Sequence, residues 1–203
     1  MQKSPIFEKT YQDYLTQIAD LDLRSLEDKL GIQVAGDKAI IRFFHKAYTV
    51  SDSGISDPQG RKPHLSICVI LCKYLLMCPS HEPQETVWVT FKDFKDAAPL
   101  TNSFATTVTN PIAKMFSGRR AELEKAGHRL GGYRPPESFS YDVSIQFDAL
   151  PRIPVLLLFN DRDEEFAAQC SVLFEQRTAK YLDMECVAML GMLLYTYLSD
   201  LSR

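Results

Sequence analysis

The sequence predicts an α+β fold with a mixed, mainly antiparallel sheet, N-terminal helices, a buried central helix and a C-terminal helix packed on the sheet. Two observations carry this prediction: apolar runs typical of strands occur in clusters, and helical patterns separate the clusters. Regular strand–helix–strand units are absent, which disfavours a doubly wound parallel sheet. The length of 203 residues suits one globular domain over residues 1–203.

The clearest strand pair lies near the C-terminus. Ile153–Phe159 is a continuous apolar run, which is typical of a strand buried on both faces. The polar stretch Asn160–Glu165 indicates a turn, and Cys170–Phe174 is a second apolar run. We therefore expect an antiparallel hairpin with a long loop.

A helix is expected to follow this hairpin. Asp183 stands at an N-cap position and Glu185 lies in the first turn, where a carboxylate complements the helix dipole. Apolar residues then recur at helical spacing from Val187 to Leu201. Gly191 in mid-helix costs about 1 kcal/mol relative to alanine. We expect another backbone to pack closely against it.

The first third of the chain predicts helices around a small group of strands. A helix begins at Ser4-Pro5, and a short second helix ends at Gly31. Leu65–Met77 is apolar almost all round, which is typical of a buried central helix. Between the helices, three runs predict strands: Ile32–Val34, Ala39–Phe44 and Tyr48–Val50.

The middle of the chain alternates between strands and helices. The sequence predicts a strand over Thr86–Phe91, a loop over Asp93–Leu100, a helix over Asn102–Phe116 interrupted near Pro111, and a helix over Ala121–Leu130 ending at Gly131-Gly132. Val143, Ile145 and Phe147 alternate with polar residues, so we expect a strand with one solvated face.

Composition and charge limit the classes of partner and the cellular location that we expect. The net charge of −3 disfavours a nucleic-acid partner. We find no basic segment followed by an apolar core at the start, and no apolar run near 18 residues, so we expect neither signal peptide nor membrane span. Five cysteines without framework spacing favour reduced thiols and a cytoplasmic location.

The acidic residues near the C-terminus are the first candidate ligand-binding group. Four share the hairpin loop and two open the last helix: Asp161, Asp163, Glu164, Glu165, Asp183 and Glu185. Carboxylates are the ligands that Mg²⁺ and Ca²⁺ prefer. The loop lacks the glycine and alternating oxygen ligands of a calcium loop, so a solvated turn and a helix cap are the favoured interpretation. We predict no metal.

Cysteine and histidine form a second pattern. His64, Cys68 and Cys72 follow a spacing of four and share one helical face. Zinc sites usually place two ligands in a short knuckle, and iron–sulfur spacing is absent. Since the surrounding residues are apolar, we expect Cys68 and Cys72 to be buried and metal-free. No cofactor is predicted.

A basic segment, residues 114–134, is the third candidate. Arginines beside a helix N-terminus can hold an anionic group. Gly131-Gly132 would let a ligand approach the backbone, and Tyr133 would supply an apolar wall. The alternative is a solvated face whose arginines pair with Glu122, Glu124 and the acidic loop. The candidate residues are Arg119, Arg120, His128, Arg129 and Tyr133.

Familiar catalytic motifs are missing. The sequence contains neither the nucleophile motif G-x-S-x-G nor the dinucleotide motif G-x-G-x-x-G, and no arrangement resembles a catalytic triad. This disfavours common hydrolase and dinucleotide chemistry. It leaves open whether the chain is an enzyme.

Several stretches together resemble a known family, the domain of unknown function 3786. They are Leu150–Pro154, Asp163–Ala167, Leu173-Phe174, Tyr181-Leu182, Glu185–Gly191, the helix Ser66–Met77 and Trp88–Phe91. The resemblance implies a prokaryotic, often anaerobic source, with some relatives joined to iron–sulfur domains. It brings no activity and no catalytic residues. Without a cluster motif, this chain would be the stand-alone form.

From these observations we expect a cytoplasmic binding or accessory module for a protein partner or a small anionic ligand. The resemblance implies a link to anaerobic redox or corrinoid metabolism. The alternative is an enzyme that uses a divalent cation held by the acidic cluster around Asp161–Glu165. Neither nucleic acid nor membrane is expected as a partner.

Overall fold

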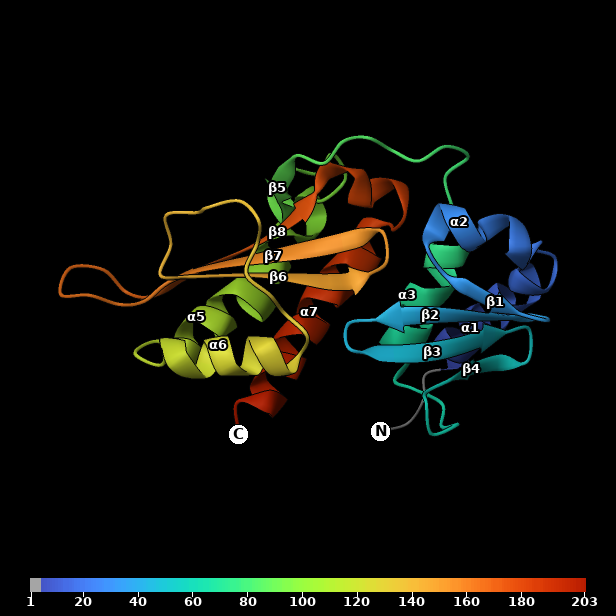
Figure 1. Ribbon diagram of the computed structural model, residues 1–203, viewed down its shortest axis with the longest axis horizontal. Coiled ribbons are helices and arrows are strands. Elements are labelled where there is room, and N and C mark those ends of the chain that lie inside the picture. The colour runs from blue at the N-terminus through green and yellow to red at the C-terminus, as the bar shows by residue number, and fades with distance from the viewer. Residues whose placement is uncertain (1–4) are drawn as a thin grey trace.

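Two antiparallel four-stranded sheets organise the protein (Figure 1). The computed structural model describes the backbone of residues 5–203 and the side chains of residues 9–203, so the expected cap at Ser4 lies outside the described residues. The first sheet has the order β1-β2-β3-β4, and the second has the order β5-β8-β7-β6. The α+β class is confirmed, with the strands divided between two sheets.

The first sheet and its helices occupy one half of the molecule (Figure 1). As expected, α2 ends at Gly31, which adopts a left-handed φ of 65°. The short β4 was not expected. The elements are α1 (Pro5–Ala19), η1 (Leu23–Leu26), α2 (Glu27–Leu30), β1 (Gln33–Ala35), β2 (Lys38–Phe43), β3 (Lys46–Ser51), β4 (Gly54–Ser56) and α3 (Leu65–Leu76).

The second sheet and the remaining helices form the other half. Its elements are β5 (Trp88–Thr90), η2 (Phe91–Asp93), η3 (Ala98–Leu100), α4 (Thr101–Phe104), η4 (Ala105–Thr109), α5 (Asn110–Phe116), α6 (Arg120–Arg129), β6 (Val143–Leu150), β7 (Ile153–Asn160), β8 (Gln169–Glu175), η5 (Gln176–Lys180) and α7 (Met184–Leu201).

Two details differ from the expectation for residues 93–116. The predicted loop contains a short 3-10 turn, η3, and η2 ends at its first residue. The helix before Pro111 widens into the π-helical turn η4. Proline has no N–H for the carbonyl four residues before it, and a π turn is a common way to accommodate such a break.

The hairpin of β7 and β8 is confirmed. Leu156 and Leu157 point to opposite faces of the sheet and are both fully buried, as expected of a strand covered on both sides. Asn160 pairs with Gln169, which closes the ladder. Residues 161–168 form a loop that projects from the molecule (Figure 1).

Helix α7 connects the two halves. It packs against α3 on one side and against α5 and α6 on the other. Asp183 caps it and accepts the Cys186 N–H at 2.9 Å. A methyl group at Gly191 would lie 2.5 Å from Phe104 Cε2, so the close approach is real. The neighbour is an aromatic side chain, whereas we expected a backbone.

The expectation that no apolar segment approaches 18 residues needs correction for α7. The 18 residues of α7 are long and apolar enough to cross a bilayer by length and composition, although single charged residues interrupt the apolar run. Core helices of globular proteins pass the same test. Leu190 and Leu194 of α7 are buried inside the protein.

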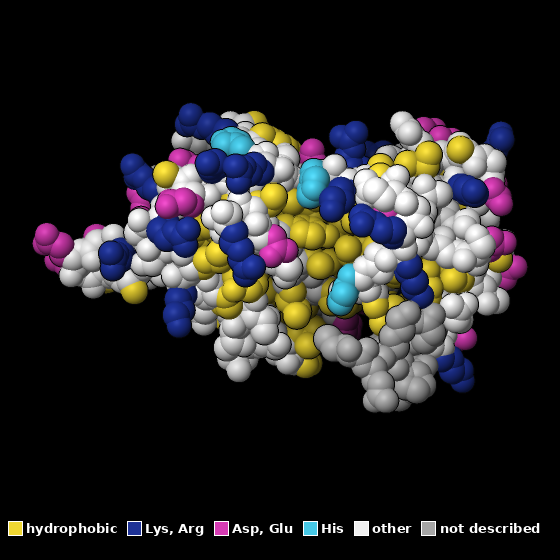
Figure 2. Space-filling view, turned by 90° about the horizontal axis from the view of Figure 1, so that it is seen from below, with side chains coloured by type: hydrophobic (Ala, Val, Ile, Leu, Met, Phe, Trp, Pro, Cys, Tyr) yellow, Lys and Arg dark blue, Asp and Glu magenta, His cyan; other side chains and the backbone are white. Residues whose placement is uncertain are grey.

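The halves share a continuous apolar core. The Phe44 N–H donates to the Ala149 carbonyl at 2.9 Å, which joins the first sheet to the end of β6. Hydrophobic side chains form a band between the halves on the face shown in Figure 2. Cys68 and Cys72 of α3 are fully buried in this core, as predicted.

Candidate functional site

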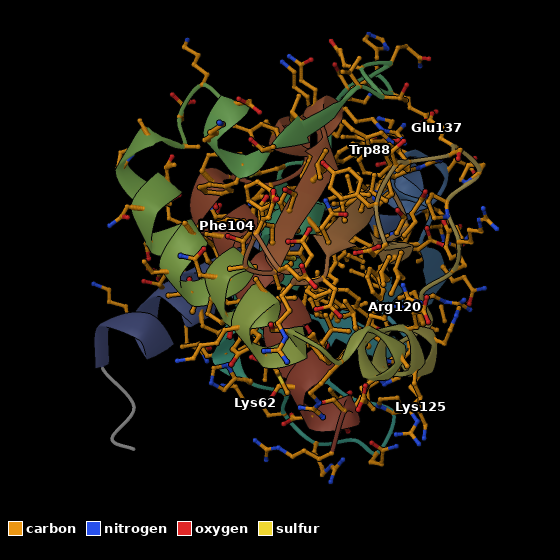
Figure 3. All side chains as sticks on the ribbon, turned by 90° about the vertical axis from the view of Figure 1, so that its left-hand side faces the viewer. Lys62, Trp88, Phe104, Arg120, Lys125 and Glu137 are labelled. Carbon is orange, nitrogen blue, oxygen red and sulfur yellow. The ribbon has the colours of Figure 1, made fainter. Side chains whose placement is uncertain are left out.

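The basic segment and the acidic loop meet in one cleft. The start of α6 and the loop after β7 enclose a volume of about 540 Å³. Figure 3 looks toward this end of the molecule and labels Arg120 at the beginning of α6. The charged and glycine residues of the lining are Gly118, Arg119, Arg120, Glu122, Asp142, Asp161, Arg162 and Asp163.

Backbone amides hold the first carboxylates of the cleft. Asp161 Oδ1 accepts the Gly118 N–H at 2.6 Å and the Arg162 N–H at 2.8 Å. Asp142 Oδ2 accepts the Asp161 N–H at 2.7 Å. These bonds fasten the loop to the turn before α6, and they stabilise both carboxylates in place.

The next carboxylate of the loop folds the loop itself. Asp163 Oδ1 accepts the Glu165 N–H at 2.8 Å and the Phe166 N–H at 2.7 Å. Hydrogen bonds from these two amides lower the pKa of Asp163. Glu164 and Glu165 lie exposed at the tip. Two of the loop carboxylates, Asp161 and Asp163, therefore serve as acceptors for the chain's own amides.

The cationic side chains of the cleft are less engaged. Arg119 Nε lies 3.6 Å from Glu122 Oε1, a loose and exposed ion pair. Arg120 and Arg162 have neither a side-chain hydrogen bond nor an ion pair among the described residues. No side chain caps α6, so its first amides add partial positive charge. The cleft consequently presents two free guanidinium groups.

A second pocket adjoins the cleft and shares Asp142 with it. Its volume is about 330 Å³, and it lies between α6, β6 and residues 133–142. Ser144 Oγ lies buried there with no hydrogen-bond partner among the described residues. Its lining includes Glu124, His128, Tyr133, Arg134, Phe139 and Tyr141.

Tyr133 is held rigidly in the wall of this second pocket. Its hydroxyl donates to Asp148 Oδ1 at 2.8 Å and accepts from Gln146 Nε2 at 2.9 Å. Burial and the neighbouring Asp148 carboxylate raise the pKa of Tyr133 to about 12. The side chain is therefore a neutral ring with a fixed orientation.

The other predicted basic residues have local partners. His128 Nδ1 lies 3.0 Å from the Gly132 carbonyl, so Nδ1 carries a proton that this carbonyl accepts. Arg129 Nη1 donates to the Leu201 carbonyl at 3.0 Å. Arg129 thus caps the end of α7, and it does not line the cleft.

The Gly131-Gly132 turn has a different role from the one expected. A methyl group at Gly132 would lie 2.5 Å from Ile145 and 2.6 Å from Phe147. The close approach at Gly132 is therefore between the turn and β6, and a ligand does not occupy that space. Gly131 adopts φ 89°, which other residues reach only with strain.

The six acidic candidates do not form one cluster. Asp183 Oδ2 pairs with Lys73 Nζ of α3 at 2.9 Å, so Asp183 and the following Glu185 belong to the start of α7. Neither residue lines the cleft at α6. Among the described residues, no three histidine, cysteine or acidic side chains gather in a way that could hold a metal ion.

Sequence reasoning missed two contributors to the cleft. Arg162 was passed over because it stands between acidic residues in a loop that was interpreted as acidic. Asp142 directly precedes β6, and only the three-dimensional structure brings it to the Asp161 amide. The only signal for Arg162 in the sequence is its position as a single cation between Asp161 and Asp163.

Fold and cleft together define an α+β protein with a charged cleft at the edge of its second sheet. The chain belongs to the family described as domain of unknown function (DUF3786), whose model matches residues 22–197. No curated protein and no solved structure matches the chain. The resemblance seen in the sequence is thus confirmed, and its prokaryotic and iron–sulfur implications stay predictions.

Proposed function

We propose that this protein is a binding module for a small ligand that carries a phosphate or carboxylate group. The observation that supports the proposal is the pair of free guanidinium groups, Arg120 and Arg162, in the cleft at the start of α6. Planar guanidinium groups suit oxyanions because they can donate two parallel hydrogen bonds. The uncapped first turn of α6 adds a favourable field for the same charge.

The hydrogen bonds that the cleft carboxylates already accept favour an anion-binding module over an enzyme that uses a divalent cation. A metal ion would have to compete with the amides that Asp161 and Asp163 already accept. An anion needs no such exchange, since the arginines have no partner to give up. The accessory role in anaerobic redox or corrinoid metabolism is supported by the resemblance alone.

Size supports a ligand larger than a simple ion. A volume of about 540 Å³ falls within the usual range for small-molecule sites. The adjoining pocket offers the rings of Tyr133, Phe139 and Tyr141. A ligand with an oxyanion at the arginines and an apolar or ring portion toward these residues would use both spaces.

The test compares two double variants of equal charge change. Arg120→Ala with Arg162→Ala removes the free cations of the cleft, and Arg24→Ala with Arg42→Ala removes two exposed cations of the other half. A ligand that binds only the native state raises the melting temperature. We expect phosphate, pyrophosphate and citrate to stabilise the parent and the control, and to stabilise the cleft variant much less. An equal response in all three proteins would contradict the proposal.

A further inference from the structure

A second pair of arginines converges on one carboxylate, and none of the three residues lines the cleft. Arg152 lies in the turn between β6 and β7, and Arg177 lies in η5. Arg152 Nη1 is 3.2 Å from Glu82 Oε1, and Arg177 Nη1 is 3.7 Å from the same oxygen. Two guanidinium groups from separate elements therefore point at one place.

Other contacts fix both guanidinium groups. Arg152 Nε donates to the Lys29 carbonyl at 3.1 Å, and Arg152 Nη2 donates to the Asp28 carbonyl at 2.5 Å. Arg177 Nε pairs with the carboxylate of Glu175. The two Nη1 atoms would keep their positions if Glu82 moved away, so the site is preorganised.

Glu82 reaches this site from a segment with little structure of its own. Residues 77–87 join α3 to β5 and cross between the two halves (Figure 1). Residues 84–87 are exposed, and the Glu82 side chain is 45% exposed compared with 17% for Arg177. The end of the segment is fixed, since the Arg177 N–H donates to the Glu85 carbonyl at 3.0 Å and the Gln176 N–H donates to the Val87 carbonyl at 2.8 Å. Residues 79–84 are therefore the part that can change position at low cost.

A buried hydroxyl without a partner lies among the same charges. Tyr181 is 0% exposed, and its hydroxyl has no hydrogen-bond partner among the described residues. Burial raises the pKa of Tyr181, whereas the charges of Arg177 and Arg152 lower it. Buried polar groups are nearly always paired in folded proteins, so an unpaired one indicates a contact still to be made.

We propose that Arg152 and Arg177 form a second oxyanion site, which the Glu82 carboxylate occupies in the free protein. An incoming carboxylate or phosphate takes the place of the Glu82 carboxylate, receives the two Nη1 donors, and displaces residues 79–84, while the backbone hydrogen bonds of Glu85 and Val87 to η5 stay in place. The competing internal carboxylate reduces the apparent affinity by the fraction of time during which the site is open.

The decisive variant is Glu82→Ala, with Glu85→Ala as its matched control. Both remove one exposed carboxylate from the same segment, but no side-chain contact of Glu85 is found among the described residues. Trp88, the single tryptophan, follows this segment and pairs with Glu175 in the sheet, so its fluorescence reports on the site. Inorganic phosphate is the probe. We expect Glu82→Ala to bind phosphate about tenfold more tightly than the parent and the control.

Second substitutions in the Glu82→Ala protein show which site is responsible for the tighter binding of phosphate. Arg177→Lys in the Glu82→Ala background keeps a cation beside Glu175 but loses the planar fork, so the gain should disappear. Arg120→Ala in the same background should retain it, because Arg120 belongs to the other cleft. If Glu82→Ala binds phosphate no more tightly than Glu85→Ala, Glu82 is only a clamp between the halves and the proposal is wrong. That result would leave the cleft at α6 untouched.

Discussion

The packing of α7 predicts most directly that Gly191→Ala destabilises the protein. A methyl group at this position would lie 2.5 Å from Phe104 Cε2, 2.9 Å from Phe104 Cζ and 3.3 Å from Val108 Cγ2. Contacts below 3 Å require something to move. The Phe104 ring has little freedom, since it stacks on Phe91 at 4.4 Å between centroids and meets the edge of Phe174 at 6.2 Å.

Two opposing terms decide the magnitude. Alanine in mid-helix gains about 1 kcal/mol over glycine from helix propensity. Forcing an extra carbon into a well-packed core costs about 1–3 kcal/mol. Since the neighbouring ring is held on two sides, we take the upper part of that range and expect a net loss of about 1–2 kcal/mol. In a chain of this length, such a loss lowers the melting temperature by about 2–8 °C.

Urea unfolding followed by fluorescence measures this free energy directly. Ala188→Gly on the same helix is the control, and it should cost about 1 kcal/mol through propensity, in addition to the contacts that its half-buried methyl group makes with the core. A second variant, Phe104→Leu, should relieve part of the clash when combined with Gly191→Ala, which a double-mutant cycle detects. A Gly191→Ala protein as stable as the parent, or more stable, would refute the packing argument.

Three further predictions follow from single contacts. Gly132→Ala should cost about 3 kcal/mol in urea unfolding, because its methyl group would meet Ile145, Phe147 and, at 2.9 Å, the rigid Gly127 carbonyl; a cost below that of Gly191→Ala would contradict it. Tyr74→Phe should cost about 1–3 kcal/mol by the same method, because the hydroxyl donates to the Leu30 carbonyl at 2.6 Å and accepts the Arg152 N–H at 3.1 Å; the partly exposed Tyr14→Phe is its control and should cost less than about 0.5 kcal/mol. Burial raises the pKa of Asp183, but the Cys186 N–H and Lys73 lower it by more, so the folded pKa lies below the usual value. Asp183 therefore adds stability above about pH 4, and Asp183→Asn should cost about 1 kcal/mol at pH 7, with a difference that is lost as the pH falls through the lowered pKa of Asp183; a difference independent of pH would overturn this assignment.

Local patterns predicted most of the secondary structure because the relevant interactions are local. The uninterrupted apolar run of β7 indicates burial on both faces, and the capping residue Asp183 indicates the start of α7. The π turn η4 and the short β4 escaped prediction. A π turn depends on how the helix fits its neighbours, and a three-residue strand carries too little pattern to stand out.

The location of the cleft could be predicted only in part. Residues 114–134 and the loop after β7 were both recognised as charged, yet their meeting depends on the hydrogen bond from Gly118 to Asp161, across 43 positions of the chain. Arg129 and Asp183 were predicted as candidate ligand-binding residues, and the structure gives each a helix end as its partner. The sequence shows which side chains are charged, but it does not show which of them already have a hydrogen-bond or ion-pair partner in the fold.

The difference between charged groups that already have partners and those that have none is the basis of our proposal for the cleft. By formal count, its lining holds four acidic and three basic side chains, which would favour a cation. Asp142, Asp161 and Asp163 each accept at least one backbone N–H. Glu122 lies loosely beside Arg119. The carboxylates keep their charge, but their acceptor atoms are already engaged, whereas the guanidinium groups of Arg120 and Arg162 keep free donors among the described residues. Those free donors are why we propose an oxyanion as the ligand of this cleft.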